Sequence, residues 1–135
     1  MIRLAVPAAL LLTLGATSAG TQTRAPDRAT ARVEKTLAGL TPGAPQRCLR
    51  RDRVTELRTA PNVILYVAGR DRVWRNDVVG EGCARGLARG DIVVSRNLVS
   101  GEYCSGDLIH MRVRTGGTLT GTCSLGQFVP YTRNR

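Results

Sequence analysis

The stretch that decides the fold is Asn62-Val63-Ile64-Leu65-Tyr66-Val67-Ala68, which follows a break at Pro61. Its β-branched and aromatic residues are typical of a β-strand. Gly69-Arg70-Asp71 then provides turn residues, and Arg72-Val73-Trp74-Arg75 resumes the strand-like composition. This part of the sequence therefore predicts an antiparallel β-hairpin in the middle of the chain.

The residues that follow the hairpin predict more short strands. Asp91–Leu98 is rich in β-branched residues, and a turn at residues 115–117 joins two further strands, Leu108–Arg114 and Thr118–Cys123. Residues 127–129 predict a last short strand, whereas Asp77–Gly90, with four glycines, predicts a long ordered loop. Five or six short strands with frequent turns indicate a mainly β fold, either a small antiparallel barrel or a rolled sheet.

The strand at Leu108–Arg114 has the alternation of a half-buried antiparallel strand. One face is expected to be mostly polar and to consist of Leu108, His110, Arg112 and Arg114. The other face is expected to be apolar and to consist of Ile109, Met111 and Val113.

A helix is predicted before the strands. Asp27 is a suitable N-cap, and apolar residues then recur at helical spacing until Gly39. We expect a helix over about Asp27–Ala38, followed by a Pro- and Gly-rich linker at residues 41–45. Residues 20–46 are thus predicted to form a leader, and residues 47–135 a β domain.

The first residues resemble a cleavable secretory signal peptide over residues 1–19. Arg3 gives a positive start, Leu4–Leu14 is apolar apart from Thr13, and Ala16-Thr17-Ser18-Ala19 offers small residues for cleavage. An apolar run of about 11 residues is too short to cross the hydrocarbon core of a membrane as a helix. We therefore expect an exported protein, periplasmic or secreted, with no membrane span.

The cysteines predict two disulfides, because Cys48, Cys83, Cys104 and Cys123 are an even set in a chain expected to be exported. A zinc site is disfavoured because the set contains no closely spaced pair, and we expect no metal or cofactor. Four cysteines allow three connectivities, which the sequence does not distinguish. Our preference is Cys48–Cys123 with Cys83–Cys104, so that one bridge joins the ends of the domain and the other its middle.

The chain is strongly basic, with 20 Lys and Arg against 10 Asp and Glu and a net charge of +10. Loss of Arg3 with the signal leaves +9. Such a charge attracts polyanions such as nucleic acids, anionic lipids or acidic glycans, although the few aromatic residues disfavour a dedicated single-strand nucleic-acid binder. The arginines that cluster as a possible anion-binding set are Arg47, Arg50, Arg51, Arg53, Arg112 and Arg114.

An enzyme of this kind, such as a secreted ribonuclease, needs a general acid and a general base beside a phosphate-binding arginine. The chain has one histidine, His110, which would have to act with Glu56 or Glu102. Nothing in the spacing singles this set out. We therefore predict no catalytic residues, and a phosphodiester or glycan hydrolase using His110 with a Glu is the alternative.

Motifs spread over residues 48–131 resemble an uncharacterised family of small exported four-cysteine proteins of alphaproteobacteria, sphingomonads especially. They are Cys48-Leu49, the hairpin from Ile64 to Asn76, Gly82-Cys83 with Gly86-Leu87, residues 104–109, and residues 121–131. The resemblance implies a periplasmic or secreted location in a Gram-negative bacterium. It implies no catalytic residue and no ligand.

Taken together, these patterns predict a non-enzymatic binding or structural module with weak affinity for anionic partners. The partner would be an anionic component of the cell envelope or another periplasmic protein. A third possibility is an inhibitor of another enzyme; a basic lysozyme is a disfavoured target, because its inhibitor should be acidic.

Overall fold

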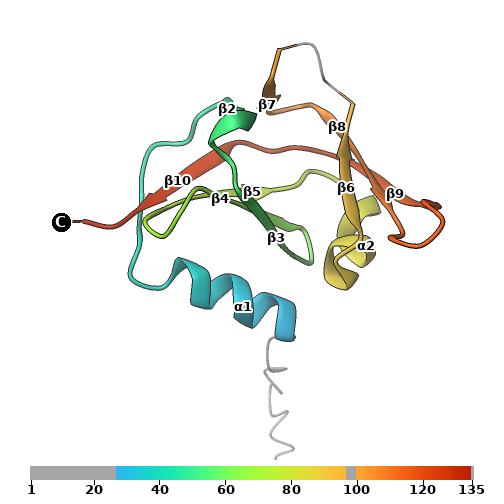
Figure 1. The fold of residues 1–135 in the computed structure, drawn as a ribbon, viewed down its shortest axis with the longest axis horizontal. Helices are drawn as coiled ribbons and strands as arrows, with labels where there is room; N and C mark the ends of the chain where they lie inside the picture. Colours follow the sequence, from blue (N-terminus) through green and yellow to red (C-terminus); the bar gives the residue numbers. More distant parts are fainter. Residues whose placement is uncertain (1–26, 97–99, 135) are drawn as a thin grey trace, which may run out of the picture.

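The computed structural model describes residues 27–96 and 100–134, and in these residues the chain is mainly β (Figure 1). The predicted signal peptide, residues 1–19, and the first part of the predicted leader lie outside the described residues. The strands form three antiparallel sheets of five, two and three strands. They roll around a common core, and the described residues do not close into a single barrel.

The largest sheet has the strand order β1-β10-β5-β4-β3, with every neighbouring pair antiparallel. The predicted hairpin is confirmed as its centre, because β4 and β5 pair with Tyr66 opposite Trp74. Its strands are β1 (Thr41–Pro42), β3 (Glu56–Ala60), β4 (Val63–Val67), β5 (Arg72–Asp77) and β10 (Phe128–Thr132).

Strand β4 is apolar at every position because the large sheet is covered on both faces. Ile64 and Tyr66 point into the main core, whereas Leu65 and Val67 point to the opposite face and pack under α1. All four side chains are buried. A strand buried on both sides has a continuous hydrophobic sequence instead of an alternating one, which explains the run that the sequence shows here.

The main core is closed by the two smaller sheets. One has the order β6-β8-β9, and the other pairs β2 with β7. The predicted alternation in β8 is confirmed, since Ile109 and Met111 are fully buried and Leu108 is exposed. These strands are β2 (Cys48–Arg50), β6 (Ile92–Ser95), β7 (Glu102–Cys104), β8 (Leu108–Arg112) and β9 (Leu119–Ser124).

The predicted helix is confirmed as α1 (Arg28–Leu37), capped by the Asp27 carboxylate, which accepts a hydrogen bond from the Thr30 N–H at 2.8 Å. Its buried residues Ala29, Val33 and Leu37 pack on the outer face of the large sheet, below the sheet in Figure 1. The residues after it also join the sheet, because β1 pairs with β10. The described part of the predicted leader therefore shares a core with the β domain.

The prediction of a long loop at Asp77–Gly90 is wrong in part. This segment contains a short 3₁₀ helix, η2 (Glu81–Cys83), and a helix, α2 (Ala84–Arg89), which ends at Gly90 in the left-handed conformation (φ 74°). Leu87 of α2 is fully buried in the main core. A second 3₁₀ helix, η1 (Arg51–Arg53), follows β2. Neither described α-helix is long and apolar enough to cross a membrane.

Two disulfides are present, as predicted, but the preferred pairing is wrong. The bridges are Cys48–Cys104, with a Cα–Cα distance of 4.1 Å, and Cys83–Cys123, at 5.6 Å. Cys48 lies directly opposite Cys104 in the β2–β7 pair. Because bridges follow which strands become neighbours, the order of the cysteines along the chain does not give their partners.

The second bridge lies where η2 crosses β9 at close range. A Cβ on Gly121 would collide with the Gly82 carbonyl oxygen, and a Cβ on Gly82 would collide with the Thr122 carbonyl oxygen. The two backbones can meet only because both positions are glycine. The crossing sets Cys83 beside Cys123 and fixes the first turn of α2 against the small sheet.

Candidate anion-binding groove

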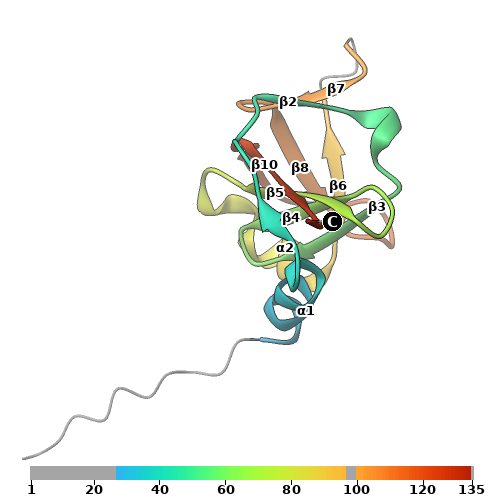
Figure 2. The ribbon, with the colours of Figure 1, turned by 90° about the vertical axis from the view of Figure 1, so that its left-hand side faces the viewer.

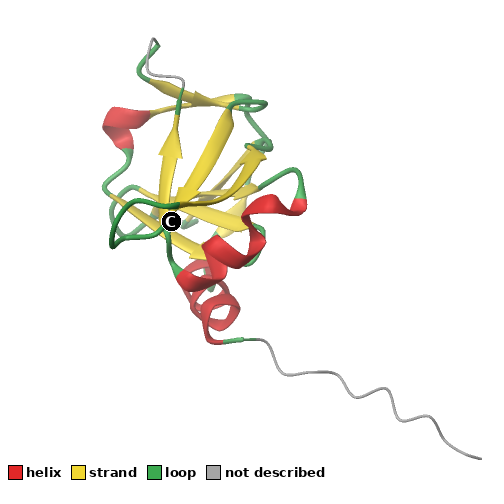
Figure 3. Cartoon of the chain, turned by 90° about the vertical axis from the view of Figure 1, so that its right-hand side faces the viewer, coloured by secondary structure: helices red, strands yellow, loops and turns green. Residues whose placement is uncertain are grey.

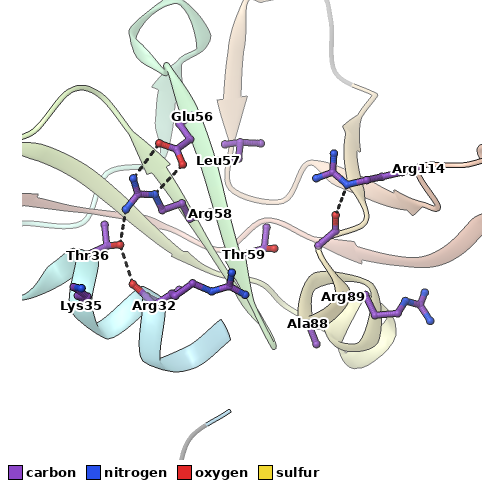
Figure 4. Close-up of a pocket in the computed structure, with 12 residues that line it drawn as sticks. Arg32, Lys35, Thr36, Glu56, Leu57, Arg58, Thr59, Ala88, Arg89 and Arg114 are labelled. Atoms are coloured by element: carbon purple, nitrogen blue, oxygen red, sulfur yellow. Dashed lines mark hydrogen bonds and ion pairs between the residues drawn. The ribbon is translucent and has the colours of Figure 1, made fainter. Parts of the chain in front are cut away.

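A groove of about 680 Å³ lies between α1, the outer strand β3 and the end of α2 (Figure 4). The helix α1 forms one wall, and Ala88, Arg89 and Gly90 form the other. Leu57 and Thr59 of β3 line it as well. Figures 2 and 3 show α1 and α2 on the same side of the molecule, away from the β2–β7 pair.

The groove is basic. Five cations line it against a single carboxylate, Glu56, and the cations are Arg32 and Lys35 from α1, Arg58 from β3, Arg89 from α2 and Arg114 from the residues after β8. Like charges concentrated in a concave site raise the local concentration of counter-charged ligands more than the same charges on a convex surface. The groove is therefore the best candidate for binding anions.

Two of the five cations are held by carboxylates. Arg58 donates from Nε and Nη2 to Glu56, at 2.9 and 3.1 Å, and from Nη1 to the Thr36 hydroxyl. The hydrogen bonds from Arg58 hold the pKa of Glu56 below its usual value and raise the pKa of Arg58. Arg89 donates to Asp91 at 2.7 Å. These pairs fix the walls of the groove and partly neutralise its charge.

Three cations keep their charge unpaired. Among the described residues, no ion pair involves Arg32, Lys35 or Arg114. Within the described ranges, Arg114 donates from Nε to the Gly90 carbonyl at 3.1 Å and Arg32 donates from Nε to the Arg28 carbonyl, and neither donates from a terminal nitrogen. In Figure 4 the Arg32 side chain extends from α1 toward β3, and the Arg114 guanidinium points toward β3 from the other side. Their terminal nitrogens are thus available for an anionic ligand.

Of the arginines predicted to bind anions, the groove contains only Arg114. Arg112 donates to the Gly117 carbonyl at its own hairpin turn. Arg50 pairs with Asp52, and the Arg51 guanidinium lies 4.9 Å from the centre of the Tyr103 ring. The other two are exposed, with Arg47 directly before β2 and Arg53 at the end of η1.

The arginines predicted to bind anions are mostly neighbours in the chain, whereas the groove collects cations from four separate segments. One signal for it was present in the sequence, since Arg32 and Lys35 lie on the polar face of the predicted helix. The structure adds that this helix packs against β3, the outer strand of the large sheet. The contribution of Arg58 and Arg89 depends on β3 and α2, which were not predicted.

The alternative acid–base set is not assembled. His110 Nδ1 lies 3.0 Å from the Thr122 hydroxyl, and no described carboxylate forms an ion pair with His110. Glu56 is engaged by Arg58 in the groove. Glu102 lies in β7 beside the Cys48–Cys104 bridge. The two sulfur atoms there are bonded to each other, so they offer no thiolate to a metal.

The aromatic side chains are used in the core. Tyr66, Trp74 and Phe128 are buried, and burial raises the pKa of the Tyr66 hydroxyl far above its usual range. The half-buried Tyr103 packs on Tyr66 with ring centres 5.1 Å apart and is covered by Arg51. None of the described residues that line the groove is aromatic, so these residues provide no stacking platform of the kind that single-stranded nucleic acids use.

Comparisons of the chain with protein-family models, curated proteins and solved structures gave no match. The function of the groove must therefore follow from its own residues.

Proposed function

We propose that this protein is a non-enzymatic binding module of the periplasm or the extracellular space, and that it binds anionic partners in the groove between α1, β3 and α2. The observation that carries the proposal is the set of unpaired cations, Arg32, Lys35 and Arg114, on a groove with one carboxylate that is already engaged. Arginine suits this role, because its planar fork of donors matches the geometry of carboxylate and phosphate groups.

The location is supported by one observation and one prediction. Both disulfides are of a kind that persists in oxidising compartments, and the predicted signal peptide favours export. Weak, salt-dependent affinity is expected for anions in an open basic groove, since exposed charges are screened over about 8 Å at physiological ionic strength. The hydrolase alternative draws no support from the surroundings of His110.

The proposal is tested with a charge reversal at the groove. Arg32→Glu with Arg114→Glu should weaken the binding of a fluorescein-labelled heparin oligosaccharide by on the order of tenfold or more at about 0.15 M salt. The matched control is Arg53→Glu with Arg70→Glu, which changes the net charge equally at two exposed arginines outside the groove. Fluorescence anisotropy measures both affinities.

The control variant should lose only the part of the affinity that depends on the total charge. Equal losses in the two variants would show that the oligosaccharide responds to net charge and not to the groove, and would refute the proposal.

A further inference from the structure

The strand that lines the groove is the edge of the large sheet. In the part of the chain that the structure describes, β3 pairs with β4 on one side only, and the sheet order ends there. An edge strand presents unpaired N–H and C=O groups that another extended chain can use as a template. Leu57 and Thr59, at the middle of β3, line the groove at this open edge.

The turn between β3 and β4 shows which backbone groups face outward. Pro61 and Asn62 form a two-residue turn, with Asn62 at φ 60°, closed by Ala60 opposite Val63. The closing pair of such a hairpin is a hydrogen-bonded pair, and alternate residues of the strand then bond to the partner strand. Ala60, Arg58 and Glu56 thus bond to β4. The N–H and C=O groups of the residues between them point away from β4.

Of these outward residues, Leu57 is the accessible one. The side chain of Thr59 donates to the Leu87 carbonyl of α2 at 2.9 Å, so α2 covers that end of the edge. Leu57 is 37% exposed. Among the described residues, the backbone of Leu57 makes no hydrogen bond outside the sheet. The edge is therefore open at the centre of the basic groove.

Resting on the function proposed above, we propose that the partner is an acidic peptide segment that binds in extended conformation along β3, as an added strand. Main-chain hydrogen bonds at Leu57 would provide the register, as in other cases of strand addition. Side chains of an extended peptide alternate between two faces. One face would meet Arg32 and Lys35 on the α1 side, and the other would meet Arg114.

The same features disfavour an anionic lipid surface. The other exposed large hydrophobic residues lie on or beside the β6–β8–β9 sheet, and none of them lines the groove; they are Val79, Ile92, Leu108 and Leu119. A membrane surface would need them gathered beside the cations. A peptide requires only the edge, the charges and one apolar contact, which Leu57 provides.

The test measures the affinities of two peptides for the protein and compares them. The first is a fluorescein-labelled peptide of repeated Glu-Glu-Val units, which presents glutamates on both faces of an extended strand. The second has the same side chains but methylated nitrogens at alternate positions, which removes N–H donors along one edge. Methylation should weaken binding by about tenfold or more, as expected for the loss of two backbone hydrogen bonds. Heparin binding provides the charge-only reference.

Variants of the protein at Leu57 test the same main-chain hydrogen bonds between β3 and the peptide. Leu57→Pro removes the outward N–H while keeping the bonds of Glu56 and Arg58 to β4, and proline is tolerated on edge strands. The matched control, Leu57→Ala, removes the side chain and keeps the N–H. We expect Leu57→Pro to weaken peptide binding and Leu57→Ala to weaken it less, because only proline removes the outward N–H.

Each outcome is decisive. Equal affinity for the methylated and unmethylated peptides, or tight binding of phosphatidylglycerol vesicles in place of either peptide, would overturn strand addition and leave the anion-binding groove standing. Loss of heparin binding only in the control reversal, Arg53→Glu with Arg70→Glu, would instead overturn the proposed function. If Leu57→Pro does not fold, the comparison of the two peptides on the unmodified protein still gives the answer.

Discussion

At the scale of single residues, Asn76 is the buried polar side chain on which the packing of the large sheet depends. It is fully buried in β5. Its amide group donates to the Gly126 carbonyl at 2.7 Å and accepts from the Gly126 N–H at 2.9 Å. Gly126 must be glycine, because a Cβ there would collide with the Asp77 carbonyl oxygen. The Asn76 side chain thereby fixes the backbone at Gly126, just before β10 begins.

Replacing Asn76 by alanine should lower the free energy of unfolding by about 3 kcal/mol, since it leaves a buried N–H and a buried C=O without partners. Urea denaturation measures the change. The matched control is Asn134→Ala, an exposed residue whose amide donates to Thr41, with an expected change within about 0.5 kcal/mol. Similar losses in the two variants would contradict the role assigned to Asn76.

At the scale of elements, Asp91 joins the end of α2 to β9. Its carboxylate accepts hydrogen bonds from Arg89 at 2.7 Å and from the Thr120 hydroxyl at 2.8 Å. These bonds, that of Arg89 first, hold the pKa of Asp91 below its usual value of 3.8. The ionised carboxylate therefore stabilises the folded chain, and it does so only where it remains deprotonated.

The direction of the pKa shift of Asp91 determines how the stability of the protein changes with pH. Because the pKa is lower in the folded protein, the stabilisation is fully present above the pKa of the unfolded chain and is lost as the pH falls through the folded-state value. The unmodified protein should thus lose more stability than Asp91→Asn between about pH 5 and about pH 2. Denaturation midpoints measured across this range check it, and parallel profiles would contradict it.

The elements that the sequence predicted are those with strong local patterns. The hairpin of β4 and β5, the strand β8 and the helix α1 each have a composition or periodicity that needs no distant partner to be recognised. Strands β2, β3 and β7 have no composition or periodicity that could be recognised in this way. β3, for example, is exposed over Glu56, Leu57 and Arg58, so neither face of it carries an apolar alternation.

The short helix α2 was missed for a related reason. It has six residues, fewer than a helix needs to be stable by itself in water. It is held by the burial of Leu87 and by the disulfide of the adjacent Cys83. The groove was missed in turn, because two of its cations depend on β3 and α2.

At the scale of the whole molecule, the two disulfides should open in a defined order. Their cysteines are separated by 56 and 40 residues, so chain entropy gives each bridge a similar stabilisation of about 4 kcal/mol. The two disulfides differ instead in the solvent exposure of their cysteines. Cys83 and Cys123 are buried, at 0% and 6% exposed, whereas Cys48 and Cys104 are half-buried.

We therefore expect a mild reductant to open Cys48–Cys104 first under native conditions. Alkylation of the freed thiols followed by mass spectrometry identifies the bridge. A double variant, Cys48→Ala with Cys104→Ala, serves as the control and should show no fast phase of alkylation. Earlier labelling of Cys83 and Cys123 in the unmodified protein would contradict the expected order.

The place of β10 in the large sheet has a consequence for how the chain acquires its shape. β10 lies between β1 and β5, although a ribosome makes it after every other strand. Until Phe128–Thr132 emerges, β1 has no neighbour and one side of β5 stays open. Contacts between distant residues, such as Thr41 with Thr132, slow folding. The chain should thus stay open until β10 is available and close in a late, cooperative step.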